Sequence, residues 1–162
     1  MIAIEAYLFR STRALFAGLV LLLASCAATP PGPLLSGPLP PQPPGTARLI
    51  FYRGLDYYGT QSMPTVYLNN QPTGISQNGA VFYRDVAPGV YAISIAPSLP
   101  YPNQFKTVVL KPGDVFYAQI GTLPQLDGRF NTTQRSYGDT FIVTLRDPAT
   151  GAYETQGLRL GS

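Results

Sequence analysis

From residue 47 onward, the chain consists of short runs of apolar and aromatic residues separated by segments rich in Pro, Gly, Asn and Asp. Inside these runs apolar side chains recur at every second position, as at Tyr91, Ile93 and Ile95. A period of two places alternate side chains on one face of a strand, and no part of this region sustains a helical period. We therefore expect about seven or eight strands among the runs 48–53, 65–68, 74–76, 80–84, 90–95, 105–110, 114–121, 140–146 and 154–160.

Turn-forming residues separate these runs. The expected tight turns and hairpins are at Asn69-Asn70, Asn78-Gly79, Pro88-Gly89 and Pro112-Gly113. Among them Asn78-Gly79 is the strongest hairpin signal, because this pair readily adopts the positive φ angles that a two-residue turn needs. Residues 121–138 are polar and predict a long loop. Short strands at this spacing predict an all-β domain over residues 47–162, built as an antiparallel β-sandwich.

The first part of the chain, residues 1–25, has the three zones of an export signal. Arg10 and Arg13 give it a positive start, residues 14–23 are nearly all aliphatic, and two small residues follow. That order is typical of a signal peptide. The apolar run is shorter than the roughly 20 residues that a helix needs to cross a bilayer, so it does not predict a membrane span.

The next residues, Leu23-Ala24-Ser25-Cys26, resemble the lipobox of bacterial lipoproteins. The resemblance implies that the Cys26 sulfur receives a diacylglycerol, that the chain is cut before Cys26, and that a palmitate-type chain then acylates the new amine. Two or more such chains hold a protein firmly on its membrane. Ala27, rather than Asp, follows the cysteine, which implies the periplasmic face of the outer membrane. The alternative is an ordinary secretory signal in which Cys26 carries no lipid.

A proline-rich stretch separates this region from the expected strands. Residues 27–46 contain eight prolines and no charged residue. Such a composition favours an extended spacer with a reach of at most about 60 Å. We expect a signal peptide at 1–25, a lipidated and proline-rich tether at 26–46, and the β-sandwich at 47–162. The alternative is that the prolines form a docking segment for a proline-recognising partner.

Charge and cysteine content narrow the classes of partner. Without Arg10, Arg13 and Glu5, which leave with the signal peptide, the 11 basic and 8 acidic residues become nine and seven. This slight, dispersed charge is not the concentrated basic face that nucleic acid requires, so we expect no nucleic-acid partner. With Cys26 lipidated, no thiol is left for a disulfide, and a domain of about 115 residues can rest on its hydrophobic core alone.

The chain contains no His and no Trp. Without His, a nucleophile would depend on Lys106, Lys111 or a carboxylate, and no serine motif lies near either lysine. Most Asp residues stand beside Gly, Pro or a strand end, where Asp caps backbone N–H groups. Zinc and copper sites need His or Cys, and no Asp-x-Asp ladder suits calcium. We therefore expect no enzyme, no cofactor and no metal site; a carboxylate-dependent hydrolase is the distant alternative.

Tyrosine is frequent, with 11 residues in the chain. Four of them fall in expected loops and are candidate ligand contacts: Tyr57, Tyr58, Tyr101 and Tyr137. Exposed loop aromatics stack on sugars or anchor protein partners. Three arginines are candidate partners for ligand carboxylates: Arg53, Arg84 and Arg135. The competing interpretation folds these tyrosines back over the ends of the sandwich.

Residues 47–121 also resemble a family of uncharacterised bacterial lipoprotein domains. Four motifs carry the resemblance: Ala47–Gly54, Val66–Gly74, Pro88–Ser94 and Pro112–Tyr117. It implies a prealbumin-like β-sandwich and no established activity. One difference is Asn70-Gln71 in place of the usual glycine turn, which predicts a longer hairpin.

These observations lead to one expectation and one alternative. The chain is expected to be a membrane-anchored cell-envelope lipoprotein whose non-catalytic sandwich serves protein interaction or envelope structure. The alternative is a module that binds glycan or peptidoglycan through the loop tyrosines. The expected partners are the membrane, an envelope protein and, in the alternative, peptidoglycan.

Overall fold

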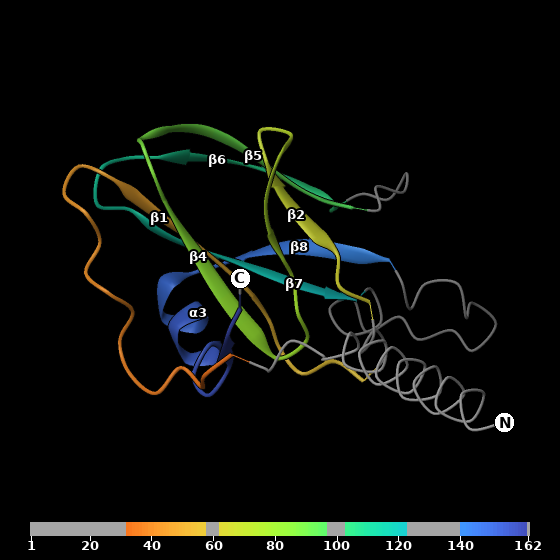
Figure 1. Cartoon of the computed structure of the whole chain (residues 1–162). Helices are drawn as coiled ribbons and strands as arrows, with labels where there is room; N and C mark the ends of the chain where they lie inside the picture. The colour runs from red at the N-terminus through yellow and green to blue at the C-terminus, as the bar shows by residue number, and fades with distance from the viewer. Residues whose placement is uncertain (1–31, 58–61, 97–102, 123–139, 162) are drawn as a thin grey trace, which may run out of the picture. The chain divides into compact units, whose positions relative to one another are not determined.

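Two β-sheets that face one another form the body of the domain (Figure 1). The computed structural model describes residues 32–57, 62–96, 103–122 and 140–161, which belong to one compact unit. These residues form nine strands and one short helix. The expected all-β class with two sheets is confirmed. The signal peptide and Cys26 lie outside the described residues.

The larger sheet contains the strands β1 (Ala47–Arg53), β4 (Ala80–Val86), β7 (Val115–Thr122), β8 (Phe141–Arg146) and β9 (Arg159–Leu160). Their order is β8-β7-β1-β4-β9, and every residue of the central strand β1 is buried. β1 pairs antiparallel with β4 but parallel with β7, and β4 pairs parallel with β9. The sheet is therefore mixed, and the expectation of a wholly antiparallel sandwich is wrong.

The smaller sheet contains the strands β2 (Thr65–Leu68), β3 (Gln71–Ile75), β5 (Gly89–Ala96) and β6 (Phe105–Leu110). Their order is β3-β2-β5-β6, with antiparallel pairing throughout. Asn69 and Asn70 have φ angles of 49° and 63°, and Leu68 pairs directly with Gln71. The expected tight turn is confirmed. The longer hairpin is wrong, because Asn tolerates the left-handed region that a two-residue turn requires.

The other three expected hairpins are crossings between the two sheets. The Asn78-Gly79 turn joins β3 to β4, residues 87–88 join β4 to β5, and residues 111–114 join β6 to β7. The side-chain amide of Asn78 accepts a hydrogen bond from Asp56 N at 2.8 Å and donates to Asp56 O at 3.1 Å. This contact with the segment after β1 orients the turn. A turn motif thus predicts a chain reversal, whereas distant contacts decide whether its flanking strands pair.

The main core lies between the two sheets. Its buried side chains come from both sheets, and Phe51 stacks on Phe82 with ring centroids 5.0 Å apart. Ile93 and Ile95 are almost completely buried there, as their alternation predicts. At one edge, a Cβ on Gly74 would lie 2.5 Å from the Phe82 ring, so β3 approaches β4 closely because this residue has no side chain.

The C-terminal region differs from the closing strand expected at 154–160. Helix α3 (Pro148–Glu154) begins after Asp147, whose carboxylate accepts a hydrogen bond from Thr150 N at 3.0 Å. An Asp N-cap followed by Pro in the first turn is a helix start signal, but the helix is too short to show a period in the sequence. Only Arg159–Leu160 forms a strand. The expected strand is therefore wrong over most of its length.

Candidate functional site

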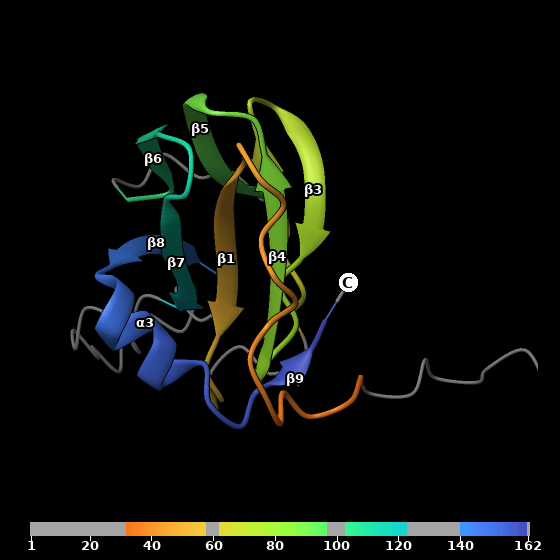
Figure 2. The same ribbon diagram turned by 90° about the vertical axis from the view of Figure 1, so that its left-hand side faces the viewer.

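Residues 33–42, which we call the strap, lie across the outer face of the larger sheet (orange in Figure 2). Hydrogen bonds hold its first end to the C-terminal segment. Leu160 N donates to Pro33 O at 2.8 Å, and Leu35 N donates to Leu158 O at 2.7 Å. The strap is therefore attached to the domain by backbone pairing, close to the point where the described residues begin.

An apolar cluster on the outer face of the sheet explains why the strap packs there. Ile50 and Val81 are 2 % and 0 % exposed, and Leu35 and Leu39 of the strap pack against this cluster. Without the strap these side chains would face water at a free-energy cost. Residues 33–42 of the expected spacer are therefore packed on the domain rather than extended away from it.

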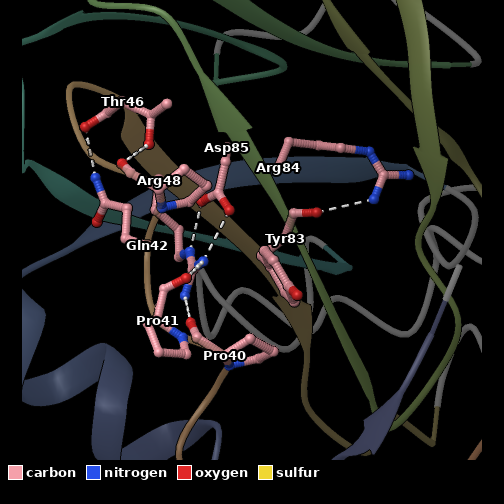
Figure 3. Close-up of polar contacts among 9 residues, drawn as sticks. Pro40, Pro41, Gln42, Thr46, Arg48, Tyr83, Arg84 and Asp85 are labelled. Carbon is pink, nitrogen blue, oxygen red and sulfur yellow. Dashed lines mark hydrogen bonds and ion pairs between the residues drawn. The ribbon is translucent and has the colours of Figure 1, made fainter.

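Arg48 holds the second end of the strap (Figure 3). Its Nη1 donates to the carbonyl of Pro40 at 2.6 Å, and Nη2 donates to that of Pro41 at 3.5 Å. The same guanidinium grips Asp85, from Nε to Oδ1 at 2.6 Å and from Nη2 to Oδ2 at 2.8 Å. It also lies 4.5 Å from the centroid of the Tyr83 ring. One side chain therefore ties the strap to two neighbouring strands.

The electrostatics of this clamp follow from its geometry. The hydrogen bonds from Arg48 lower the pKa of the Asp85 carboxyl below its ordinary value of 3.8, and the carboxylate in turn raises the pKa of Arg48. A planar guanidinium matches a carboxylate with two parallel bonds, which suits a site where Arg48 is 5 % exposed. Asp85 directly follows the strand expected at 80–84, where Asp is expected to cap a turn, but it lies within β4 and pairs with Arg48. A charged residue inside an otherwise apolar run is the signal for such a partner.

A cleft of about 400 Å³ lies between the strap, helix α3 and the outer face of the sheet. None of the residues that line it carries a charge. The largest part of the lining is aliphatic or aromatic and comes from Leu35, Leu39, Ile50, Val81 and Tyr117. Residues of α3 and of the turn after it complete the wall.

Close packing and polar contacts fix helix α3 against the sheet. A Cβ on Gly151 would lie 2.1 Å from the Tyr117 ring, so the helix backbone rests directly on that ring. The Tyr52 hydroxyl donates to the Glu154 carboxylate. Burial, together with this hydrogen bond, raises the pKa of Tyr52. Arg146 Nε lies 3.5 Å from the same carboxylate. The helix is thus a fixed wall of the cleft.

The smaller sheet exposes an uncharged outer face. Val90 pairs with Val109 and Ser94 pairs with Phe105, and the three apolar members of these pairs are 60–63 % exposed. Outward positions alternate with the inward, buried Ile93 on β5. The outward residues of β5 and β6, which we call the apolar face, are Val90, Ala92, Ser94, Phe105, Thr107 and Val109.

One predicted ligand contact is buried instead. Arg53 is 0 % exposed, lies 4.6 Å from the Phe141 ring centroid and donates to Ser62 O at 2.7 Å. Its Nη2 lies 3.6 Å from Asp56, which also accepts a bond from the Thr122 hydroxyl at 2.7 Å. Burial lowers the pKa of Arg53. The prediction that Arg53 contacts ligand carboxylates is therefore wrong, because its charge is used inside the domain.

The predicted tyrosine site is described only at Tyr57, which is 89 % exposed. The other predicted site residues, Tyr58, Tyr101, Tyr137, Arg135 and the lipidation residue Cys26, lie outside the described residues. Arg84 lies over the Phe82 ring at 5.2 Å and donates to Tyr83 O.

Asp residues at turns behave as expected in two places. Asp114 Oδ2 accepts a hydrogen bond from Lys111 N at 2.7 Å, and Asp147 caps helix α3. Within the described ranges, no three His, Cys, Asp or Glu residues come together as a metal-binding group. Nor does any helix there have the length and hydropathy to cross a membrane.

Comparison with known proteins gives no family assignment: no protein-family model matches the chain, and no curated protein matches its sequence. The lipoprotein-domain resemblance therefore stays a prediction.

Proposed function

We propose that this chain is a bacterial cell-envelope lipoprotein, anchored by lipid on Cys26, whose prealbumin-like β-sandwich is a non-catalytic module that binds another envelope protein. The lipobox-like residues before Cys26 and the export-signal pattern support the anchor. The observation that carries the protein-binding role is the apolar face of β5 and β6. Exposed apolar patches of this kind mark interaction sites on soluble domains.

The chemistry of the apolar face indicates its partner. Val90 and Val109 form one cross-strand pair, and Phe105 lies further along the same face, beyond the Ala92–Thr107 pair. No charged residue stands among the outward positions of β5 and β6. Burying an unpaired charge against such a face is costly. The partner is therefore a protein with an uncharged, apolar docking surface.

The strap also limits how far the domain can reach. If Cys26 is the anchor, the chain from Cys26 to Pro33 is all that separates it from the strap, and it spans at most about 25 Å. This is less than half the reach expected for a tether up to residue 46. The partner is accordingly expected close to the membrane surface.

Site-directed photo-crosslinking tests the docking role. A photo-reactive residue at Thr107, on the apolar face, should capture one dominant envelope protein in cells. The same residue at Tyr153, which is 75 % exposed on α3, is the matched control. Val109→Asp should abolish capture from Thr107 while leaving stability within about 0.5 kcal/mol, because Val109 is exposed. Equal capture from both positions, or capture only of a second copy of this chain, contradicts the proposed partner.

The anchor and the alternative role have separate tests. Labelled palmitate should enter the wild-type protein and be absent from Cys26→Ser, which should leave the membrane fraction. Retention on purified peptidoglycan that Tyr57→Ala abolishes would favour the glycan-binding alternative, for which the exposed Tyr57 is the supporting observation.

A further inference from the structure

The cleft beneath the strap takes no part in the proposed protein-binding role, which depends on the apolar face. We propose that it holds a single hydrocarbon chain. Its volume of about 400 Å³ falls in the range of pockets that bind small molecules, about 300–1,000 Å³. The inference stands whether or not the apolar face binds a protein, because the two sites lie on different sheets.

The lining of the cleft selects an apolar occupant. Ile50 and Val81 line it from the sheet, and Leu35 and Leu39 line it from the strap. No Asp, Glu, Lys or Arg lines it, so a charged group inside would be desolvated without a partner at high cost. A charged group is therefore disfavoured in the cleft, whereas an alkyl chain gains from leaving water.

The polar groups of the cleft are too few for a sugar. The Thr155 hydroxyl is buried and donates to the carbonyls of Gly151 and Ala152 at 2.9 and 3.2 Å, so its proton is not available to a ligand. Ser36 and Gln156 line the cleft but are exposed. A sugar ring would need several fixed donors and acceptors around it. The exposed Ser36 and Gln156 are instead placed to contact the polar end of a lipid whose hydrocarbon chain lies in the cleft.

Hydrogen bonds hold the strap on both sides of the cleft, so the cleft is already formed before a ligand enters. Leu35 N is bonded to Leu158 O, and Pro40 O to Arg48, so the lining residues Leu35 and Leu39 keep their positions. A site formed in advance loses less entropy on binding. The Arg48–Asp85 pair would then stabilise the ligand site as well as hold the strap on the sheet.

The hydrocarbon chain in the cleft can come from two sources. One is a lipid of the membrane. The other is the acyl chain on Cys26, a source that rests on the proposed lipidation and lies nine residues before Leu35. Both would place one alkyl chain in the cleft, so the experiment is designed to detect the chain first and its source second.

Fluorescence of cis-parinaric acid tests the site in the full chain carrying Cys26→Ser. Binding near one probe per chain is expected, and Ala152→Trp, which adds a large ring to a lining residue, should weaken it at least tenfold. Ala152 is exposed, so the variant should fold. Ala149→Trp, at an exposed position of the same helix that does not line the cleft, should bind as the parent does. Equal affinity of the parent and both variants, or an equal loss in both, overturns the proposal.

A second measurement locates the chain directly. On addition of palmitate, the methyl NMR signals of Ile50 and Val81 should shift, while those of Val66 and Ile93 in the inner core should not. Shifts in the inner core alone would overturn the proposal.

Comparing probe binding by Cys26→Ser and by acylated wild type identifies the source of the hydrocarbon chain. Probe binding by both identifies a membrane lipid as the occupant, and binding by Cys26→Ser alone identifies the protein's own acyl chain. Binding by neither overturns the proposal.

Discussion

At the scale of single residues, the guanidinium of Arg48 makes the contacts that join the strap to strands β1 and β4. An arginine that is 5 % exposed carries a desolvation penalty, which the bidentate contact with Asp85, the Tyr83 ring and the Pro40 carbonyl together offset. Removing one partner of such a pair leaves the other charge without compensation. The clamp is thus the point where a side-chain change affects the sheet and the strap together.

Asp85 makes this clamp sensitive to acid. Because Arg48 lowers the folded-state pKa of Asp85 below 3.8, the pair stabilises the fold fully above that pH and less as the pH falls through the lower folded value. Wild type should therefore lose stability in acid, and Asp85→Asn should show a flatter slope below pH 4. At pH 7 the variant should be less stable by about 1–3 kcal/mol. Urea unfolding between pH 7 and pH 2.5 measures both effects.

A second carboxylate also contributes to the acid sensitivity of the fold. The pKa of Asp147 is lowered as well, by its hydrogen bonds with Thr150, so the acid slope of Asp85→Asn should shrink rather than vanish. Identical slopes in wild type and Asp85→Asn would show that the clamp contributes nothing to acid sensitivity.

At the scale of elements, helix α3 depends on one glycine. Gly151 brings the helix backbone against the Tyr117 ring, and no side chain fits between them. Because α3 forms one wall of the cleft, the depth of the cleft depends on this contact.

The effect of Gly151→Ala on the free energy of unfolding should show whether helix propensity or packing against Tyr117 dominates at this position. Alanine favours a helix over glycine by about 0.8–1 kcal/mol, but its Cβ would meet the Tyr117 ring at 2.1 Å. We expect a net loss of about 1–3 kcal/mol in unfolding free energy, as for other overpacked sites. Gly37→Ala in the strap is the control; it has open space around the added Cβ and should change stability by less than about 0.5 kcal/mol. A stabilised Gly151→Ala would show that the helix moves freely away from the sheet.

The turns show what local sequence can and cannot predict about elements. Asn69 and Asn70 form the expected turn because their own φ angles suffice to reverse the chain between two strands of one sheet. Asn78-Gly79, the strongest hairpin signal in the sequence, also forms a turn, with Gly79 at a φ of 70°. Its flanking strands nevertheless belong to different sheets, because strand pairing depends on partners far away in the chain.

At the scale of the whole molecule, the strap changes where the domain begins. Composition alone made residues 27–46 an unattached spacer, since prolines lack N–H donors and no charge was present. The apolar outer face of β1 and β4 instead binds the strap through Leu35 and Leu39. Neither residue stood out among the prolines, and the face they cover is visible only once the sheet is assembled.

Two truncated chains should measure the contribution of the strap. One begins at residue 32 and retains the strap, and the other begins at residue 43 and lacks it. The shorter chain should lose about 2–4 kcal/mol of unfolding free energy, from two partly buried leucines and the hydrogen bonds at both ends of the strap. It should also bind an apolar dye, because Ile50 and Val81 would then be uncovered. Equal stability of the two chains in urea would mean that the strap is only a spacer.

The sequence by itself determined most of the segments that become strands, because the alternation of Ile93 and Ile95 or of Ala118 and Ile120 depends only on neighbouring residues. It also indicated the Asn69-Asn70 turn. It did not determine the C-terminal region, where a short helix replaces most of the expected strand. Only the tertiary structure decided that β1 pairs in parallel with β7, that Arg53 is buried, and that the strap and α3 enclose a cleft. Such features arise from contacts between segments distant in the chain, and their energies depend on the closed shape rather than on any local pattern.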